Sequence, residues 1–148
     1  MIRVHGTTVS IDGMGVLLRG PSGSGKSDLA LRLIDGGARL VADDQTEIRS
    51  IGGGLRASCP RSIAGLIEAR GIGIVPVPSL PSASLDLVVD LVEPAALERL
   101  PETRFLELLG CRLPLVTLAP FEASAPAKLR LAVRALATDR RKTIMIGP

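Results

Sequence analysis

Aromatic side chains are nearly missing from this chain of 148 residues, which contains two phenylalanines, no tryptophan and no tyrosine. Surfaces that stack nucleic-acid bases need aromatic faces, so this shortage argues against a nucleic-acid partner. The two cysteines, Cys59 and Cys111, lie far apart in the sequence and form no C-x-x-C pair. Neither a metal site nor a disulfide framework is therefore indicated, and we expect two buried thiols.

Long apolar runs and targeting signals are missing as well. No run reaches the length of a membrane span, and the N-terminus lacks the charged and then apolar pattern of a signal peptide. The chain does contain 46% hydrophobic residues, enough for one core of Leu, Val, Ile and Ala. The net charge of +3 is modest and suits a weakly acidic or phosphorylated partner. These features predict one cytoplasmic domain over residues 1–148 without membrane contact.

The clearest motif lies between a predicted strand and a predicted helix. An apolar run at 16–18 predicts a buried strand, and helical spacing of apolar residues predicts a helix at 27–35 that Gly36 and Gly37 end. The intervening loop matches the Walker A pattern G-x-x-x-x-G-K-[ST], with the residues Gly20, Pro21, Ser22, Gly23, Ser24, Gly25, Lys26 and Ser27. The context favours a site for nucleotide phosphates over a glycine-rich turn that binds nothing.

Each part of this loop suits nucleotide binding. Gly20, Gly23 and Gly25 can adopt positive φ and let backbone N–H groups close around phosphate oxygens, which a Cβ would obstruct. Lys26 would place a positive charge on the β- and γ-phosphates, and the Ser27 hydroxyl would coordinate Mg²⁺. The N-terminus of the following helix adds its dipole. ATP and Mg²⁺ are therefore the expected cofactors.

The remaining chain predicts an α/β fold around this unit. The expected elements are a strand at 3–11 that forms a hairpin with 16–18, a strand at 39–44, a hairpin of 45–50 and 55–58, a helical turn at 61–65, two short strands within 66–75, strands at 85–92 and 113–118, and a closing helix at 127–137. Residues 93–109 are expected to wrap the surface, and the tail at 138–148 has no assignment.

Phosphoryl transfer also needs a group that accepts the proton of the attacking hydroxyl. Asp43 and Asp44 end the strand that follows the helix, and α/β sheets bind ligands at such strand ends. Adjacent side chains face opposite ways there, so one can meet substrate while the other fixes the metal or a neighbouring loop. A plain turn is the alternative for this pair. Asp90 is the alternative acid, because an apolar run that ends in Asp is typical of a Walker B strand.

Three further charged or titratable residues have two open interpretations each. Glu68 and Arg70 lie in a glycine-rich apolar segment, where charges are costly to bury unless they are paired or bound. They form either a structural ion pair or part of a site. His5 is the only histidine, and it is either a packed surface residue or a site residue.

The order and spacing of these elements resemble a known family. The chain shows His5-Gly6, the loop at 20–27, Asp43-Asp44 after an apolar strand, and Glu68-x-Arg70-Gly71-Ile-Gly. Over roughly residues 4–92 it resembles the catalytic domain of HPr kinase/phosphorylases. The Asp-Asp and Glu-x-Arg-Gly-Ile-Gly elements are far more specific than Walker A.

The resemblance implies a cytoplasmic and typically hexameric kinase that uses ATP and Mg²⁺ to phosphorylate a serine of the phosphocarrier HPr. It implies a fold similar to phosphoenolpyruvate carboxykinase, with a central mixed sheet and flanking helices. By position, Lys26 and the loop amides would hold phosphates, Ser27 and Glu68 the metal, and His5 would line the site. Asp44 is favoured over Asp43 as the base. In the reverse reaction, inorganic phosphate would remove the group and form pyrophosphate while the same aspartate returns the proton.

Two departures from the family stand out. An N-terminal domain present in full-length members is missing here, so the chain is expected to be a short form with the catalytic domain alone. After residues 113–118 the family has Pro-Gly-Arg-Asn, whereas this chain has Pro120-Phe121-Glu122-Ala123. The phosphate-contacting arginine is therefore absent, which puts the phosphorylase direction in doubt. Arg112, Lys128 or a neighbouring subunit are the candidate substitutes.

Two other classes compete with a protein kinase. A small-molecule P-loop kinase would usually carry an arginine-rich lid, and none is evident in this sequence. A nucleotide-binding regulator that has lost turnover is supported by the missing arginine.

Overall fold

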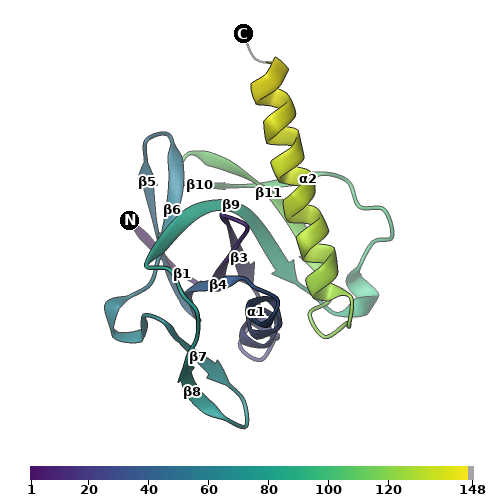
Figure 1. Cartoon of the computed structure of the whole chain (residues 1–148). Coiled ribbons are helices and arrows are strands. Elements are labelled where there is room, and N and C mark those ends of the chain that lie inside the picture. Colours follow the sequence, from purple (N-terminus) through teal and green to yellow (C-terminus); the bar gives the residue numbers. More distant parts are fainter. Residues whose placement is uncertain (147–148) are drawn as a thin grey trace.

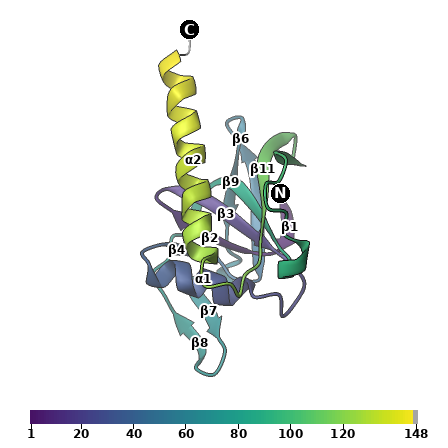
Figure 2. The ribbon, with the colours of Figure 1, turned by 90° about the vertical axis from the view of Figure 1, so that its right-hand side faces the viewer.

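The protein is an α/β domain built on a curled mixed sheet (Figures 1 and 2). The computed structural model describes the backbone of residues 1–146 and the side chains of residues 1–139. Its main sheet has the strand order β1 (Ile2–His5), β5 (Gln45–Ile51), β6 (Gly54–Ser58), β9 (Ser82–Leu91), β3 (Met14–Arg19), β2 (Thr7–Ile11) and β4 (Arg39–Ala42). The expected α/β class with a central mixed sheet is confirmed.

The strand β9 is the centre of the sheet because three strands pair with it. It runs parallel to β3 on one edge, and its other edge is shared by the antiparallel β6 and the parallel β11 (Cys111–Leu118). The strand β10 (Arg104–Leu108) extends the sheet by pairing with β11. A separate two-stranded sheet consists of β7 (Leu66–Ala69) and β8 (Gly73–Pro76).

Two apolar cores form on the two faces of this sheet because successive strand residues alternate between faces. Val16 and Leu18 of β3 face a core that includes α1 (Lys26–Asp35) and α2 (Ala125–Ile146). Leu17 faces the second core, which the curled strands β5, β6, β9 and β11 enclose. Both helices therefore cover the same sheet face, and α1 is fixed directly beside the loop that precedes it (Figure 2).

Most of the expected elements are confirmed, including the β2–β3 hairpin, the helix after the loop, the β5–β6 hairpin, the short helix η1 (Arg61–Ile63) and the strands β4, β7, β8, β9 and β11. The single strand expected at 3–11 is wrong, because the chain breaks at Gly6 into β1 and β2. The backbone N–H of Gly6 donates to the Asp44 carbonyl at 2.9 Å. A Cβ at this position would lie only 2.7 Å from Leu17 Cδ1, so a side chain does not fit there. This close crossing lets β1 join β5 while β2 pairs with β3 and β4.

Two other expectations change in the C-terminal third. Within 93–109, expected only to wrap the surface, residues 94–96 form the short helix η2 (Pro94–Ala96) and residues 104–108 form β10. The closing helix begins at Ala125 and continues to Ile146, so residues 138–146 of the unassigned tail are helical and 147–148 lie outside the described residues. In Figure 2 the end of α2 projects beyond the sheet, away from α1.

Candidate functional site

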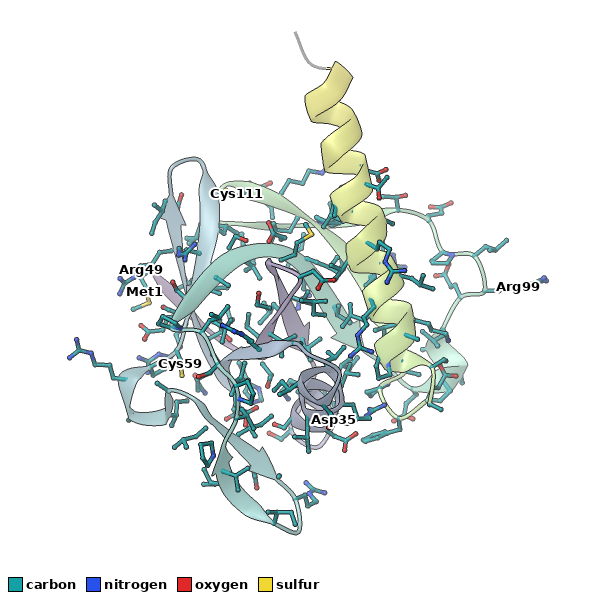
Figure 3. The ribbon with its side chains drawn as sticks, in the orientation of Figure 1. Met1, Asp35, Arg49, Cys59, Arg99 and Cys111 are labelled. Carbon is teal, nitrogen blue, oxygen red and sulfur yellow. The ribbon has the colours of Figure 1, made fainter. Side chains whose placement is uncertain are left out.

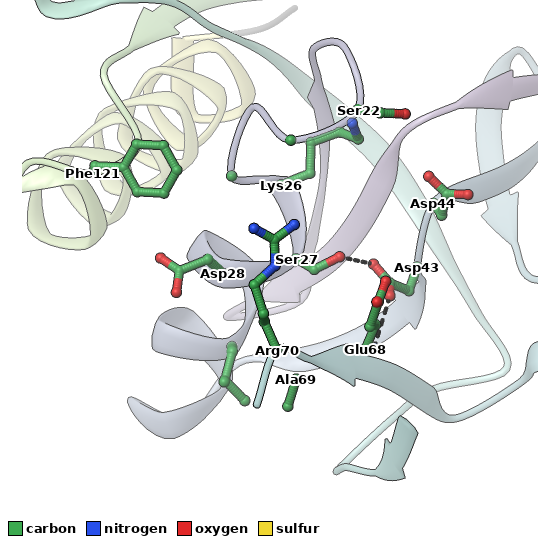
Figure 4. Close-up of a pocket in the computed structure, with 13 residues that line it drawn as sticks. Ser22, Lys26, Ser27, Asp28, Asp43, Asp44, Glu68, Ala69, Arg70 and Phe121 are labelled. Atoms are coloured by element: carbon green, nitrogen blue, oxygen red, sulfur yellow. Dashed lines mark hydrogen bonds between the residues drawn. The ribbon is translucent and has the colours of Figure 1, made fainter. Parts of the chain in front are cut away.

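Three segments meet around a pocket of about 470 Å³ (Figure 4). The first is the Walker A loop with the start of α1, the second is Asp43 and Asp44 after β4, and the third is the end of β7. The pocket is lined by Ser22, Gly23, Gly25, Lys26, Ser27, Asp28, Leu31, Asp43, Asp44, Glu68, Ala69, Arg70 and Phe121. The structure thus gathers most of the candidate residues in one place.

The loop has the backbone geometry expected of a phosphate-binding nest. Gly23 and Gly25 lie at φ +82° and +99°, a conformation that side chains with a Cβ rarely adopt. Lys26 is buried, and its Nζ donates to the carbonyls of Gly20 at 2.7 Å and Pro21 at 3.0 Å. The lysine cation is therefore held under the loop at the N-terminus of α1, where the helix dipole also favours an anion.

Asp43 is a buried carboxylate that ties three elements together. Its Oδ1 accepts hydrogen bonds from the Ser27 hydroxyl at 2.7 Å and the Thr7 hydroxyl at 3.0 Å, and its Oδ2 accepts one from the Glu68 N–H at 3.2 Å. The elements joined are α1, β2 and β7. Because the Ser27 hydroxyl donates its hydrogen bond to Asp43, the lone pairs of the Ser27 oxygen face away from Asp43 and are suited to a cation.

Asp44 has a different environment from its neighbour. Its side chain is 61% exposed and lines the pocket, and its Oδ1 accepts a hydrogen bond from His5 Nε2 at 2.7 Å. Asp44 adopts φ +66°, and its own N–H donates to the Thr7 hydroxyl at 3.1 Å. His5 stands behind Asp44 and is not among the residues that line the pocket. The pair therefore combines one enclosed carboxylate with one that a substrate can reach.

Glu68 and Arg70 reach the same pocket from β7 and the turn that follows it. Within residues 1–139, neither side chain makes a hydrogen bond or salt bridge, so the alternative of a structural ion pair between them is wrong. Figure 4 shows the Arg70 guanidinium directed toward Ser27 and Lys26. Gly71, at φ +89°, allows the turn into β8 and does not line the pocket.

The oxygen donors around Ser27 fit Mg²⁺. The described residues contain no group of three His, Cys, Asp or Glu side chains that would hold a metal alone. Mg²⁺ usually takes one or two carboxylates, several waters and substrate phosphates rather than a complete protein cage. The Ser27 hydroxyl with the carboxylates of Glu68 and Asp43 is a donor set of this kind beside the phosphate loop.

Several other sequence candidates lie outside the pocket. Asp90 forms a two-point ion pair with Arg19, at 2.8 and 3.1 Å, so the Walker B alternative for this residue is wrong. Lys128 Nζ pairs with Glu122 at 3.1 Å, and Arg112 lies 3.7 Å from the centre of the Phe105 ring. Neither cation lines the pocket, so neither replaces the missing arginine within this chain.

The two cysteines are free and lie on different parts of the molecule, as Figure 3 shows, which confirms that they form no disulfide. Both are partly exposed, which corrects the expectation of fully buried thiols. Partial burial raises the pKa of the Cys59 thiol, and the nearby carboxylates of Glu47 and Asp43 raise it further. Because the thiolate is the reactive form, Cys59 is a poor nucleophile near neutral pH.

Thr7 and Phe121 contribute to the site although no motif indicated them. Thr7 has a buried hydroxyl that holds both Asp43 and Asp44, and Phe121 forms a pocket wall. A lone threonine in a strand carries no sequence signal for such a contact, since Asp43 is 36 positions away.

Within the described residues, no helix is long and apolar enough to cross a membrane.

The chain is similar in sequence to known proteins. The HPr kinase/phosphorylase of Clostridium tetani is 51% identical over 78 residues, which are 53% of this chain and 26% of that protein. The HPr kinase/phosphorylase of Caldanaerobacter subterraneus is 50% identical over 100 residues, or 62% of this chain and 33% of that protein. The chain thus spans a quarter to a third of the length of these relatives.

The fold has a match among solved structures too. The Hpr(Ser) kinase/phosphatase of Coxiella burnetii is 31% identical, with a TM-score of 0.77 over 98% of this chain and 93% of that one. The family model described as the HPr Serine kinase C-terminal domain matches residues 1–142. This chain therefore belongs to the family of HPr serine kinase C-terminal domains.

Proposed function

We propose that this chain transfers the γ-phosphoryl group of ATP to a serine of the phosphocarrier HPr. The observation that carries the proposal is the convergence, in one pocket, of a phosphate-binding loop, a cation-binding donor set and an exposed carboxylate. The names of the relatives support HPr as the acceptor. Hexameric assembly and cytoplasmic location remain predictions from the resemblance.

Each of these residues has a separate role in the proposed phosphoryl transfer. The loop amides and Lys26 bind the phosphates. Ser27 and Glu68 would hold Mg²⁺, which would neutralise charge on the phosphate oxygens. Asp44 accepts the proton of the serine hydroxyl as the serine oxygen bonds to the γ-phosphorus. The bond from that phosphorus to the β–γ bridging oxygen breaks, and ADP leaves. Asp43 positions Ser27 by accepting the hydrogen bond of its hydroxyl, and His5 orients Asp44 by a hydrogen bond to its carboxylate.

Arg70 takes part in this proposal as the cation that faces the transferred group. Its guanidinium has no partner within residues 1–139 and points to the loop (Figure 4). Hydrogen bonds between charged groups contribute about 1.5–3 kcal/mol, so we expect Arg70→Gln to lower kcat about ten- to a hundredfold. Arg70→Lys should recover part of the rate, and kcat with a saturating HPr concentration measures both. Equal rates for Arg70→Gln and the parent would remove Arg70 from the mechanism.

The reverse reaction should be much weaker than the forward one. In phosphorolysis an inorganic phosphate dianion approaches a phosphoserine, whereas the forward nucleophile is a neutral hydroxyl. The described residues around the pocket offer Lys26 and Arg70, but Lys128 is paired with Glu122 and Arg32 with Asp28. We therefore expect little pyrophosphate release from phosphoserine-HPr and millimolar phosphate. A release rate comparable to kinase turnover would show that another cation, such as one from a neighbouring subunit, completes the site.

The fate of the label from γ-labelled ATP separates this function from its competitors. With Mg²⁺ and HPr present, a protein kinase transfers the label to HPr. A small-molecule kinase labels a metabolite of a cell extract and leaves HPr unlabelled, and a nucleotide-binding regulator binds ATP without labelling anything. Label on HPr supports the proposal if no label appears on an HPr variant in which the acceptor serine is replaced by alanine.

A further inference from the structure

A second pocket, of about 630 Å³, adjoins the first on the other side of Phe121. Its walls come from the first half of the Walker A loop, the segment at the end of β9 and the segment that follows β11. Most of the wall residues outside the loop are apolar, namely Leu91, Val92, Pro94, Ala119 and Pro120. Ser22, Gly23 and Phe121 line both pockets, so the two pockets lie side by side at the loop.

Phe121 is held in place although its side chain is exposed. It is 70% exposed and one of two aromatic residues in the whole chain. Its ring contacts the loop so closely that a Cβ at Gly25 would lie 2.9 Å from Phe121 Cζ. The Arg32 guanidinium donates to the carbonyls of Pro120 and Glu122, which fixes the backbone on both sides of the ring. A large apolar ring in such a position has a face available for a ligand at no further ordering cost.

We propose that the second pocket binds the nucleobase of the nucleotide and that Phe121 stacks on it. This inference rests on the proposed function, because it requires the phosphates to occupy the Walker A loop. A concave, mostly apolar site beside a phosphate nest suits the planar base of a ligand whose other end is polyanionic. Base–aromatic stacking needs only a π face, so adenine and guanine nucleotides both gain from it.

Binding of ATP and of inorganic tripolyphosphate, each with Mg²⁺, tests the proposal by calorimetry. Tripolyphosphate reports on the loop alone, whereas ATP reports on the loop and the base pocket together. Stacking contributes about 1–3 kcal/mol per base, so Phe121→Ala should weaken ATP binding about ten- to a hundredfold and leave tripolyphosphate binding unchanged. Phe121→Tyr, which keeps the ring, should restore ATP affinity. Phe105→Ala is the matched control, because that ring lies against Arg112 and lines neither pocket.

Each other outcome separates the two proposals. If Phe121→Ala binds ATP as tightly as the parent protein, the base pocket is wrong and the proposed function stands. Equal losses for ATP and tripolyphosphate would mean that the ring only shapes the loop, which also overturns the stacking role. A parent protein that binds neither ligand overturns the nucleotide site itself. Thermal unfolding of the three variants checks that each one is folded.

Discussion

Replacement of Lys26 by alanine should abolish phosphoryl transfer to HPr while the domain remains folded. Lys26 is buried under the loop, and its Nζ is the only lysine ammonium group among the residues that line the pocket. Without this charge, the β- and γ-phosphates lose the cation that neutralises them as the bond to the leaving group breaks. Initial rates of HPr phosphorylation with saturating ATP measure the effect, and the expected rate is at the background of the assay.

The stability of the Lys26→Ala variant should change only modestly. The substitution removes two hydrogen bonds to loop carbonyls, each with a net contribution of about 1 kcal/mol, but it also removes a buried charge. Arg49→Ala, at an exposed cation of β5 outside both pockets, is the control for loss of one positive charge. Near-parental turnover in a folded Lys26→Ala protein would contradict the assignment of the loop as the nucleotide site.

Asn substitutions at Asp43 and Asp44 should produce two different defects. Asp44→Asn should keep ATP binding and unfolding temperature but lose about 10²–10⁴-fold in transfer, since an amide cannot accept the serine proton. Asp43→Asn places an amide NH₂ where a carboxylate accepts three donors, from Ser27, Thr7 and Glu68. That variant should lose about 1–3 kcal/mol of stability and bind ATP with Mg²⁺ more weakly.

The assignment within this pair has clear alternatives. If Asp43→Asn lost transfer most severely while its stability and ATP affinity stayed normal, the base would be Asp43. If both substitutions had only small effects on transfer, neither aspartate would be catalytic, and the pair would simply form the turn between β4 and β5. ATP titrations, thermal unfolding and single-turnover transfer rates with saturating HPr distinguish these cases.

The sequence predicts the parts of the site that depend on local pattern. The Walker A loop joins a strand to a helix within 20 residues, and its glycines and lysine occur where the backbone requires them. Asp43 and Asp44 do differ in exposure, as the sequence predicts, but strand alternation is not the cause, because β4 ends at Ala42 and Asp44 lies at φ +66°. Their hydrogen-bond partners could not be predicted, because Thr7 and Glu68 reach Asp43 only after the sheet has formed.

The incorrect expectations also have physical reasons. Arg112 and Lys128 are candidates by sequence to replace the missing arginine, but Arg112 stacks on Phe105 of β10 and Lys128 pairs with Glu122. The strand β10 has a weak apolar alternation, because it is an edge strand with mostly exposed residues. The extra turns of α2, at residues 138–146, lie beyond the sheet (Figure 1).

We propose that the pocket formed by the loop, Asp44 and Glu68 phosphorylates a serine of HPr. The decisive experiment is mass spectrometry of HPr after incubation with this chain, ATP and Mg²⁺, with the Lys26→Ala and Asp44→Asn variants in parallel. We expect one added phosphoryl group on a single serine of HPr, formed by the parent chain and absent or strongly reduced with both variants. Unmodified HPr in the presence of a folded parent chain that binds ATP would rule out this function.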